Sequence, residues 1–157
     1  MRRRVPVLTP NVLTGLIALV AALVVATALG FGWRSRNGKM RASAPSRSSG
    51  PARVSAADLG ESLGSRATLL QFSSAFCAPC RATRRVLADV AGMTDGVAHI
   101  EIDAESRLDL VRRLDVLKTP AVFVLGPDGQ ISKRASGQPR KADVIAAIGN
   151  VTQGNVT

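Results

Sequence analysis

The chain has 157 residues, of which 46% are hydrophobic and 3% aromatic, and a formal net charge of +10. This length allows one domain of ordinary size and an additional segment. Residues 1–53 hold nine Lys or Arg and no acidic residue, whereas residues 54–157 hold twelve basic and eleven acidic residues. Because the larger part is nearly neutral and offers few aromatic side chains for base stacking, the composition argues against a nucleic-acid-binding protein.

The first predicted element is an apolar helix over residues 12–33, which follows a basic segment at residues 1–11. From Val5 to Trp33 there is no charged residue, and this helix would be about 33 Å long, enough to cross the hydrocarbon core of a bilayer. A buried helix of a soluble protein would rarely run this long without a polar flank. A cleaved signal peptide would have a shorter apolar region than this one. Its A-x-A cleavage site would also lie closer to the apolar region than Ala42–Ala44 lies to Trp33. The sequence therefore predicts a single-pass membrane anchor with Trp33 at the interface.

Residues 34–53 are rich in Ser, Gly, Pro and Arg and have almost nothing to bury. This composition predicts a disordered linker with a reach on the order of 25 Å. Basic residues flank the apolar helix on both sides, and the larger number follows it. Counted alone, these charges would place the following domain in the cytoplasm, so the charge count by itself leaves the orientation open.

Residues 54–151 alternate strand and helix signals, and residues 152–157 form a short tail. The apolar spacing and the turn residues predict these elements in chain order: helix 55–63, strand 67–73, helix 78–91, strand 97–103, helix 106–114, strands 121–125 and 130–135 around a Gly-Pro-Asp-Gly turn, and helix 141–151. This order predicts an α/β domain in which a mixed central sheet is flanked by helices on both faces.

The only two cysteines, Cys77 and Cys80, lie where the strand at 67–73 leads into the helix at 78–91. Unsatisfied amides and the macrodipole at a helix start favour a thiolate, so Cys77 is the predicted nucleophile. Cys80, one turn deeper, is close enough to attack a mixed disulfide on Cys77. Pro79 stands in the first turn, where its missing N–H costs little.

Two other roles are open to a pair of cysteines. A zinc site needs about four ligands, and beyond the cysteines the chain has a single histidine, His99. A small core residue is the common role of a lone cysteine, but it does not explain a C-x-x-C pair at a strand–helix junction. The sequence therefore predicts a redox-active disulfide between Cys77 and Cys80, with no metal and no cofactor.

Three segments make the chain similar to the thioredoxin family: LLQFSSAFCAPCRATRR (69–85), LKTPAVFVLGPDGQI (117–131) and ASGQP (135–139). In that family a strand leads into a W-C-G-P-C motif, against which a later cis proline packs. The matching residues are Phe76–Cys80, Thr119–Pro120 and Gly137. The resemblance covers residues 54–151 and implies a thioredoxin fold with a cis Pro120. It also implies that the backbone of Thr119 pairs with an extended substrate segment.

Three positions depart from the family pattern. Phe76 stands in place of the tryptophan, and Ala78 in place of the glycine; Ala-Pro between the cysteines is closer to the Gly-Pro of reducing members and favours a reductant. Gln71 stands where members often have a buried aspartate that accepts the proton of the resolving thiol. The hypothesis is that His99, or a water held by Gln71, accepts this proton. The alternative is that His99 is only a hydrogen-bonded strand residue.

The resemblance and the apolar helix together predict a membrane-anchored thiol–disulfide oxidoreductase of bacterial type that reduces protein disulfides. Its partners would be disulfide-containing proteins and an electron donor that the sequence does not identify. Tethered relatives place this domain outside the cytoplasm, where disulfides persist, and the prediction follows them. A disulfide oxidase or isomerase of the same fold, and a non-catalytic binding module, are the alternatives.

Overall fold

The computed structural model describes residues 10–36, 39–42 and 53–153. The chain divides into two compact units, residues 1–36 and residues 37–157, and each is described by itself. Most of the predicted basic segment, most of the predicted linker and residues 154–157 of the tail lie outside the described residues.

The first unit contains helix α1 (Pro10–Arg36). Within it, Val12–Gly32 has a mean hydropathy of 2.6, and none of these residues is buried inside the chain. Among the described residues this is the one helix long and apolar enough to cross a membrane, a test that a signal sequence near the N-terminus would also pass. Its exposed apolar surface is unlike that of a core helix in a soluble domain.

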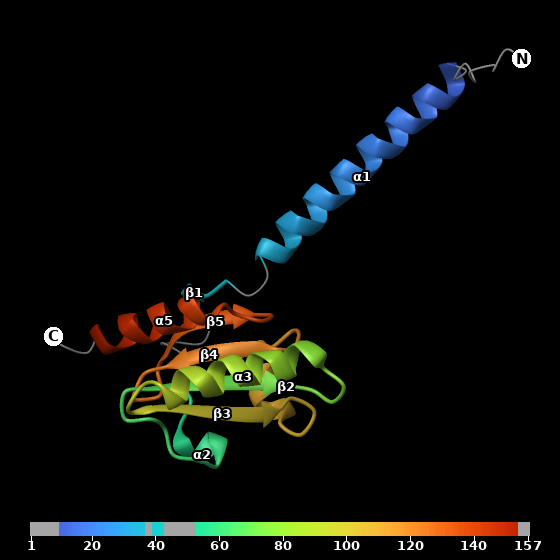
Figure 1. Cartoon of the computed structure of the whole chain (residues 1–157). Coiled ribbons are helices and arrows are strands. Elements are labelled where there is room, and N and C mark those ends of the chain that lie inside the picture. The colour runs from blue at the N-terminus through green and yellow to red at the C-terminus, as the bar shows by residue number, and fades with distance from the viewer. Residues whose placement is uncertain (1–9, 37–38, 43–52, 154–157) are drawn as a thin grey trace, which may run out of the picture. The chain divides into compact units, whose positions relative to one another are not determined.

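The second unit is built on a mixed sheet with the strand order β1-β5-β4-β2-β3 (Figure 1). Strand β2 (Ala67–Ser73) lies at its centre, parallel to β3 (Val97–Asp103) and antiparallel to β4 (Ala121–Leu125). Strand β5 (Ile131–Ser136) pairs antiparallel with β4. The predicted mixed sheet is confirmed, and its four long strands lie at the predicted positions to within a residue.

Four helices cover the two faces of this sheet. Helices α3 (Ala78–Gly92) and α5 (Lys141–Gln153) pack on one face, and the short helices α2 (Ala56–Leu59) and α4 (Leu108–Arg113) lie on the other. The α3–α5 face buries Ala67, Leu69, Leu87, Val90, Val122, Val124, Val144, Ala147 and Ile148. The α2–α4 face buries Val54, Leu59, Leu70, Phe72, Ile100, Ile102, Leu110, Leu114, Ala121, Phe123, Leu125 and Ile131.

Two of these helices are shorter than the sequence predicts. Helix α2 begins at a capping box formed by Ser55 and Asp58, as expected, but ends at Gly60, whose left-handed backbone (φ 73°) stops it after one turn. Helix α4 begins only at Leu108, because Ser106 bonds back to the carbonyl of Asp103 in the preceding turn.

The predicted disordered linker contains a short ordered strand. Strand β1 (Arg41–Ala42) pairs antiparallel with β5, placing Arg41 opposite Arg134 and Ala42 opposite Lys133. Met40, just before it, is half-buried against the core of the α3–α5 face. Residues 39–42 are thus ordered on the domain, and the predicted extent of the linker stays a prediction.

Candidate active site

The two cysteines form a disulfide at the start of α3. Cys77 is the N-cap residue, and its Sγ accepts a hydrogen bond from the backbone N–H of Cys80 at 3.1 Å. Pro79 lies in the first helical turn, where no backbone donor is required. Cys77 is half-buried, whereas Cys80 is 2% exposed. A sulfur at an N-cap lies next to the unsatisfied amides of the helix, an environment that stabilises a thiolate.

The loop before Cys77 has an unusual backbone at Phe76. This residue has φ 57°, in the left-handed region that bulky side chains rarely adopt, and its side chain is fully exposed. A bulky residue in this conformation costs free energy of folding. Because its side chain buries no surface in the domain, Phe76 does not contribute to the hydrophobic core.

The Thr119–Pro120 peptide bond is cis, and Pro120 is buried. The side-chain hydroxyls of Ser74 and Thr119 lie 2.8 Å apart, so a hydrogen bond joins the loop before Cys77 to the loop before Pro120. On its other side, the carbonyl of Pro120 accepts the N–H of Gly137 at 2.7 Å. The three segments on which the family resemblance rests are thus brought together around one end of the sheet.

Gln71 is fully buried on the central strand and contacts the backbone of Cys80. Its Nε2 donates to the carbonyl oxygen of Cys80 at 3.0 Å and to Ser73 Oγ at 2.7 Å, and lies 3.3 Å from Glu101 Oε1. With acceptors on this side, the amide nitrogen must face Cys80 and Glu101 and the amide oxygen must face away. Gln71 therefore supplies a hydrogen-bond donor, not a base, next to Cys80.

Glu101 links this buried amide to the surface of α3. Its carboxylate accepts hydrogen bonds from Ser73 Oγ and from the guanidinium of Arg84, including one from Nη2 at 2.9 Å. Burial acts to raise the pKa of Glu101, but the hydrogen bonds from Arg84 and Ser73 outweigh it, so the pKa lies below its ordinary value. Glu101 is therefore ionised at neutral pH.

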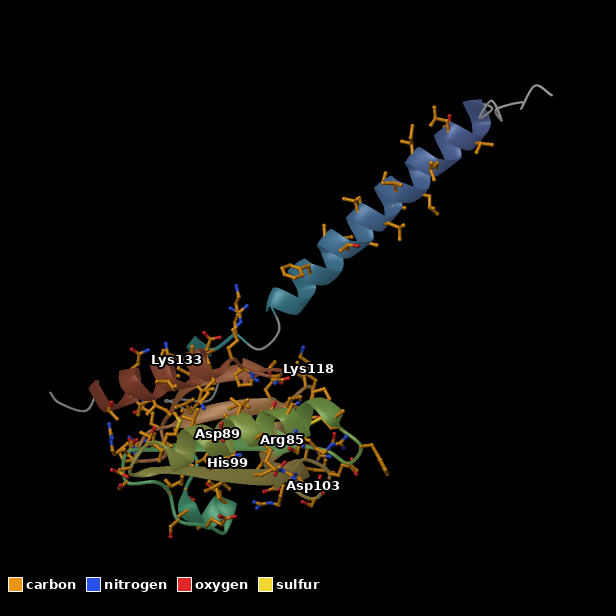
Figure 2. All side chains as sticks on the ribbon, viewed as in Figure 1. Arg85, Asp89, His99, Asp103, Lys118 and Lys133 are labelled. Carbon is orange, nitrogen blue, oxygen red and sulfur yellow. A yellow bond between two sulfur atoms is a disulfide. The ribbon has the colours of Figure 1, made fainter. Side chains whose placement is uncertain are left out.

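His99 lies on β3 beside α3 (Figure 2) and meets the other end of the same amide. Its Nε2 is 3.3 Å from Gln71 Oε1. Because that oxygen can only accept, Nε2 carries the hydrogen in the neutral ring and Nδ1 is the nitrogen free to accept a proton. Burial lowers the pKa of His99; Glu101 opposes this and Arg84 adds to it, so the ring is neutral at pH 7.

The structure brings the cysteines, Thr119 and Pro120 to one end of the sheet, while His99 lies further back on β3 and is linked to Cys80 through Gln71. Sequence reasoning did not include Glu101, Ser73 and the ion-pairing role of Arg84. The alternation of Val97–Asp103 places His99 and Glu101 on one face of a strand, but which residues they meet depends on the parallel pairing that sets Gln71 opposite Glu101. In the described part of the chain, no three His, Cys, Asp or Glu side chains gather as a metal site requires.

Comparison with known proteins gives one family. The family model described as thioredoxin matches residues 54–150. The chain is 26% identical over 96 residues to the thioredoxin of Staphylococcus saprophyticus, an alignment that covers 59% of this chain and 92% of that protein. It is 26% identical over 90 residues to the thioredoxin of Staphylococcus haemolyticus, covering 57% and 86% of the two chains.

Solved structures resemble the same part of the chain. Chloroplastic thioredoxin z superposes with a TM-score of 0.52 at 24% identity, covering 57% of this chain and 81% of that one. A mutant thioredoxin from Halobacterium salinarum gives a TM-score of 0.51 at 22% identity, covering 55% and 75%. At these identities the structural comparisons show the fold alone. Residues 1–53 lie outside the family match.

Proposed function

Because this chain belongs to the thioredoxin family, we propose that it is a membrane-tethered reductant of protein disulfides. In its wider form the function is established by the family: the protein is a thiol–disulfide oxidoreductase whose redox-active group is a cysteine pair, without an external cofactor. The observation that supports the proposed dithiol chemistry is the position of Cys77 at the N-cap of α3 with Cys80 bonded to it.

In the proposed reaction the reduced protein begins as a Cys77 thiolate and a Cys80 thiol. The Cys77 thiolate attacks one sulfur of a substrate disulfide; the S–S bond breaks, and a mixed disulfide and one substrate thiolate result. Cys80 then loses its proton and attacks Cys77, which releases the second substrate thiolate and leaves the Cys77–Cys80 disulfide. Two electrons pass to the substrate, so an electron donor must reduce the pair again.

The proton of Cys80 needs an acceptor, and we place His99 in that role, or a water held by Gln71. The support is the contact between His99 and Gln71, whose amide in turn contacts the backbone of Cys80. Because His99 Nε2 donates to Gln71, the accepting nitrogen would be Nδ1. His99→Ala should shift the pH profile of disulfide reduction, and an unchanged profile would remove His99 from the mechanism.

Substrate segments would bind beside the disulfide. Thr119, next to the cis peptide bond and hydrogen-bonded to Ser74, would pair its backbone with an extended segment of the partner. Phe76 and Leu117, which precede Cys77 and Thr119, are both highly exposed apolar side chains (101% and 86%). Their exposure beside the reactive sulfur fits contact with a partner protein.

The membrane part of the proposal rests on α1, whose apolar stretch matches the thickness of a bilayer. We take residues 12–33 as a single-pass anchor and residues 54–151 as the catalytic domain, outside the cytoplasm, where protein disulfides persist. A membrane-impermeant thiol reagent, applied to intact cells after mild reduction, should label Cys77. Labelling only after lysis would place the domain in the cytoplasm.

Two variants of the full chain test the chemistry. Cys77→Ser should lose insulin reduction in the presence of dithiothreitol, while Cys80→Ser should accumulate mixed disulfides that a reductant releases. Unchanged biological function of Cys77→Ser would instead favour a binding module. The direction of electron flow is read from the reduction potential, which is about −270 mV for thioredoxin and about −120 mV for a strong oxidase. A value near the second would contradict a reductant.

A further inference from the structure

A basic pocket lies at the β1–β5 edge of the sheet, and none of the candidate-site residues lines it. It has a volume of about 320 Å³ and is lined by the segment before β1, by β5, by Arg140 and by one side of α5. Three of its lining residues are cations, Lys39, Lys133 and Arg140, and one, Asp143, is an acid. We call Lys39, Lys133 and Arg140 the basic pocket cations. Figure 2 shows Lys133 on this side of the domain.

The basic pocket cations differ in their pairing from five other cations of the domain. Arg53, Arg84, Arg107, Arg113 and Lys141 each form an ion pair with a carboxylate. Within the described residues, no carboxylate lies within ion-pair distance of Lys39, Lys133 or Arg140, although Asp143 lines the same pocket. The pocket therefore has positive charge available for an anionic ligand.

The chain connection limits how far this pocket can be from the end of α1. Only residues 37 and 38 separate Arg36, the last residue of α1, from Lys39, and three peptide steps extend at most about 11 Å. Lys39 in turn is held on the domain by its neighbours, because Met40 packs on the core and β1 pairs with β5. Along the chain, the connection from α1 to the basic pocket is therefore short.

We propose that the basic pocket cations bind anionic lipid headgroups of the membrane that α1 spans. The inference rests on the membrane anchor of the proposed function. An anionic leaflet attracts basic residues most strongly within about one Debye length, roughly 8–10 Å, of its surface, and the short connection limits Lys39 to about that distance from the end of α1. Binding at three points from separate elements holds the β1–β5 edge on the membrane, in addition to the covalent anchor.

The test uses the full chain in nanodiscs made either of phosphatidylcholine alone or of phosphatidylcholine with phosphatidylglycerol. Lysines are acylated with an amine-reactive ester, and the rate at each lysine is read by mass spectrometry. Lys39 and Lys133 should react about five-fold more slowly in the anionic nanodiscs, and the protection should disappear at high salt. Lys118, in the loop before the cis proline, is the internal control and should react equally in both.

Matched variants separate the pocket from overall charge. Lys133→Gln/Arg140→Gln should remove most of the protection of Lys39, whereas Arg66→Gln/Arg112→Gln removes the same charge elsewhere and should leave it unchanged. Neither pair contacts the disulfide, so insulin reduction should be unaffected.

Several results would overturn the inference. Equal acylation rates in the two lipids would do so, as would protection of the same size in neutral nanodiscs. Retention of the chain on the bilayer at high salt and alkaline pH reports the anchor independently. If the chain is retained but the rates are equal, headgroup binding fails and the anchor stands. Release of the chain under those conditions refutes the anchor and, with it, the inference.

Discussion

The two faces of strand β2 show how one buried strand can serve stability on one side and chemistry on the other. Every residue of β2 is buried. On the α2–α4 face it presents Leu70 and Phe72, and the ring of Phe72 meets Phe123 edge-on, with centroids 5.8 Å apart. On the α3 face the strand turns from Leu69 to the polar residues Gln71 and Ser73, next to Cys80.

The difference shows where a buried polar group is tolerated. A buried amide is costly unless its donors and acceptors are paired, and Gln71 has partners on both its nitrogen and its oxygen. The carboxylate of Glu101, itself bound by Arg84, keeps that amide in one orientation. The apolar face needs only volume and shape, whereas the polar face needs a connected set of partners.

The largest effect is expected on the apolar face. Phe72→Ala should lower the free energy of unfolding by about 3–5 kcal/mol, because it removes a fully buried ring and leaves a cavity against Phe123. Denaturant unfolding measures it. Phe76→Ala, the same change at a fully exposed side chain, is the control and should cost about 0.5 kcal/mol or less. Similar losses for both would contradict the assignment of Phe72 to the core.

The next largest effect is expected on the polar face. Gln71→Leu keeps much of the volume but leaves the Cys80 carbonyl and Ser73 without their donor, and should cost about 1–3 kcal/mol. It should also alter the pH dependence of disulfide reduction, which Phe72→Ala at permissive temperature should not. If Gln71→Leu stabilises the protein and leaves that pH dependence intact, the two faces are alike and the comparison fails.

Acid should act through Glu101. Its pKa is lower in the folded than in the unfolded protein, so its contribution is present above the ordinary glutamate pKa, about 4.3, and is lost as the pH falls through the folded value. Glu101→Gln should therefore lower the free energy of unfolding at neutral pH by about 1 kcal/mol, a figure reduced because Arg84 is exposed to solvent. The stability of this variant should also fall less steeply as the pH is lowered. Urea unfolding at several pH values measures it. Glu105→Gln, a substitution at an exposed carboxylate, is the control and should cost about 0.5 kcal/mol or less at neutral pH.

The smallest expected effect is an increase in stability. Thr83 is fully buried one turn after Cys80, and its Oγ1 has no hydrogen-bond partner among the described residues. Thr83→Val keeps the shape and removes the unpaired hydroxyl, so it should raise the free energy of unfolding by about 1 kcal/mol. A loss in thermal unfolding would mean that a water molecule pairs this hydroxyl.

The sequence predicted most of the fold because the signals that determine it are local. Apolar periodicity and turn residues located four strands and the long helices. The two cysteines fall between one of these strands and the helix that follows it, so the redox pair was located as well. Strand β1 could not be predicted, because two residues show no periodicity and their pairing depends on contacts with β5 and on Met40.

The candidate site was predicted only in part for a similar reason. Gln71 was recognised as a departure from the family, but its partner Glu101 is thirty residues away along the chain and meets it through strand pairing. Its counter-ion, Arg84, lies on a third element, helix α3. The left-handed backbone of Phe76 has no signal at all, since the residue type argues against it.

The unequal burial of the two cysteines has a consequence for damage by oxidants. A peroxide arriving from solvent meets the half-buried Cys77 before Cys80, which is 2% exposed. A sulfenic acid formed on Cys77 would lie within bonding distance of Cys80 and would condense with it to the disulfide, with loss of water. The buried cysteine thus keeps its neighbour from the irreversible sulfinic and sulfonic acids, and a chance oxidation ends in a disulfide, which is reducible.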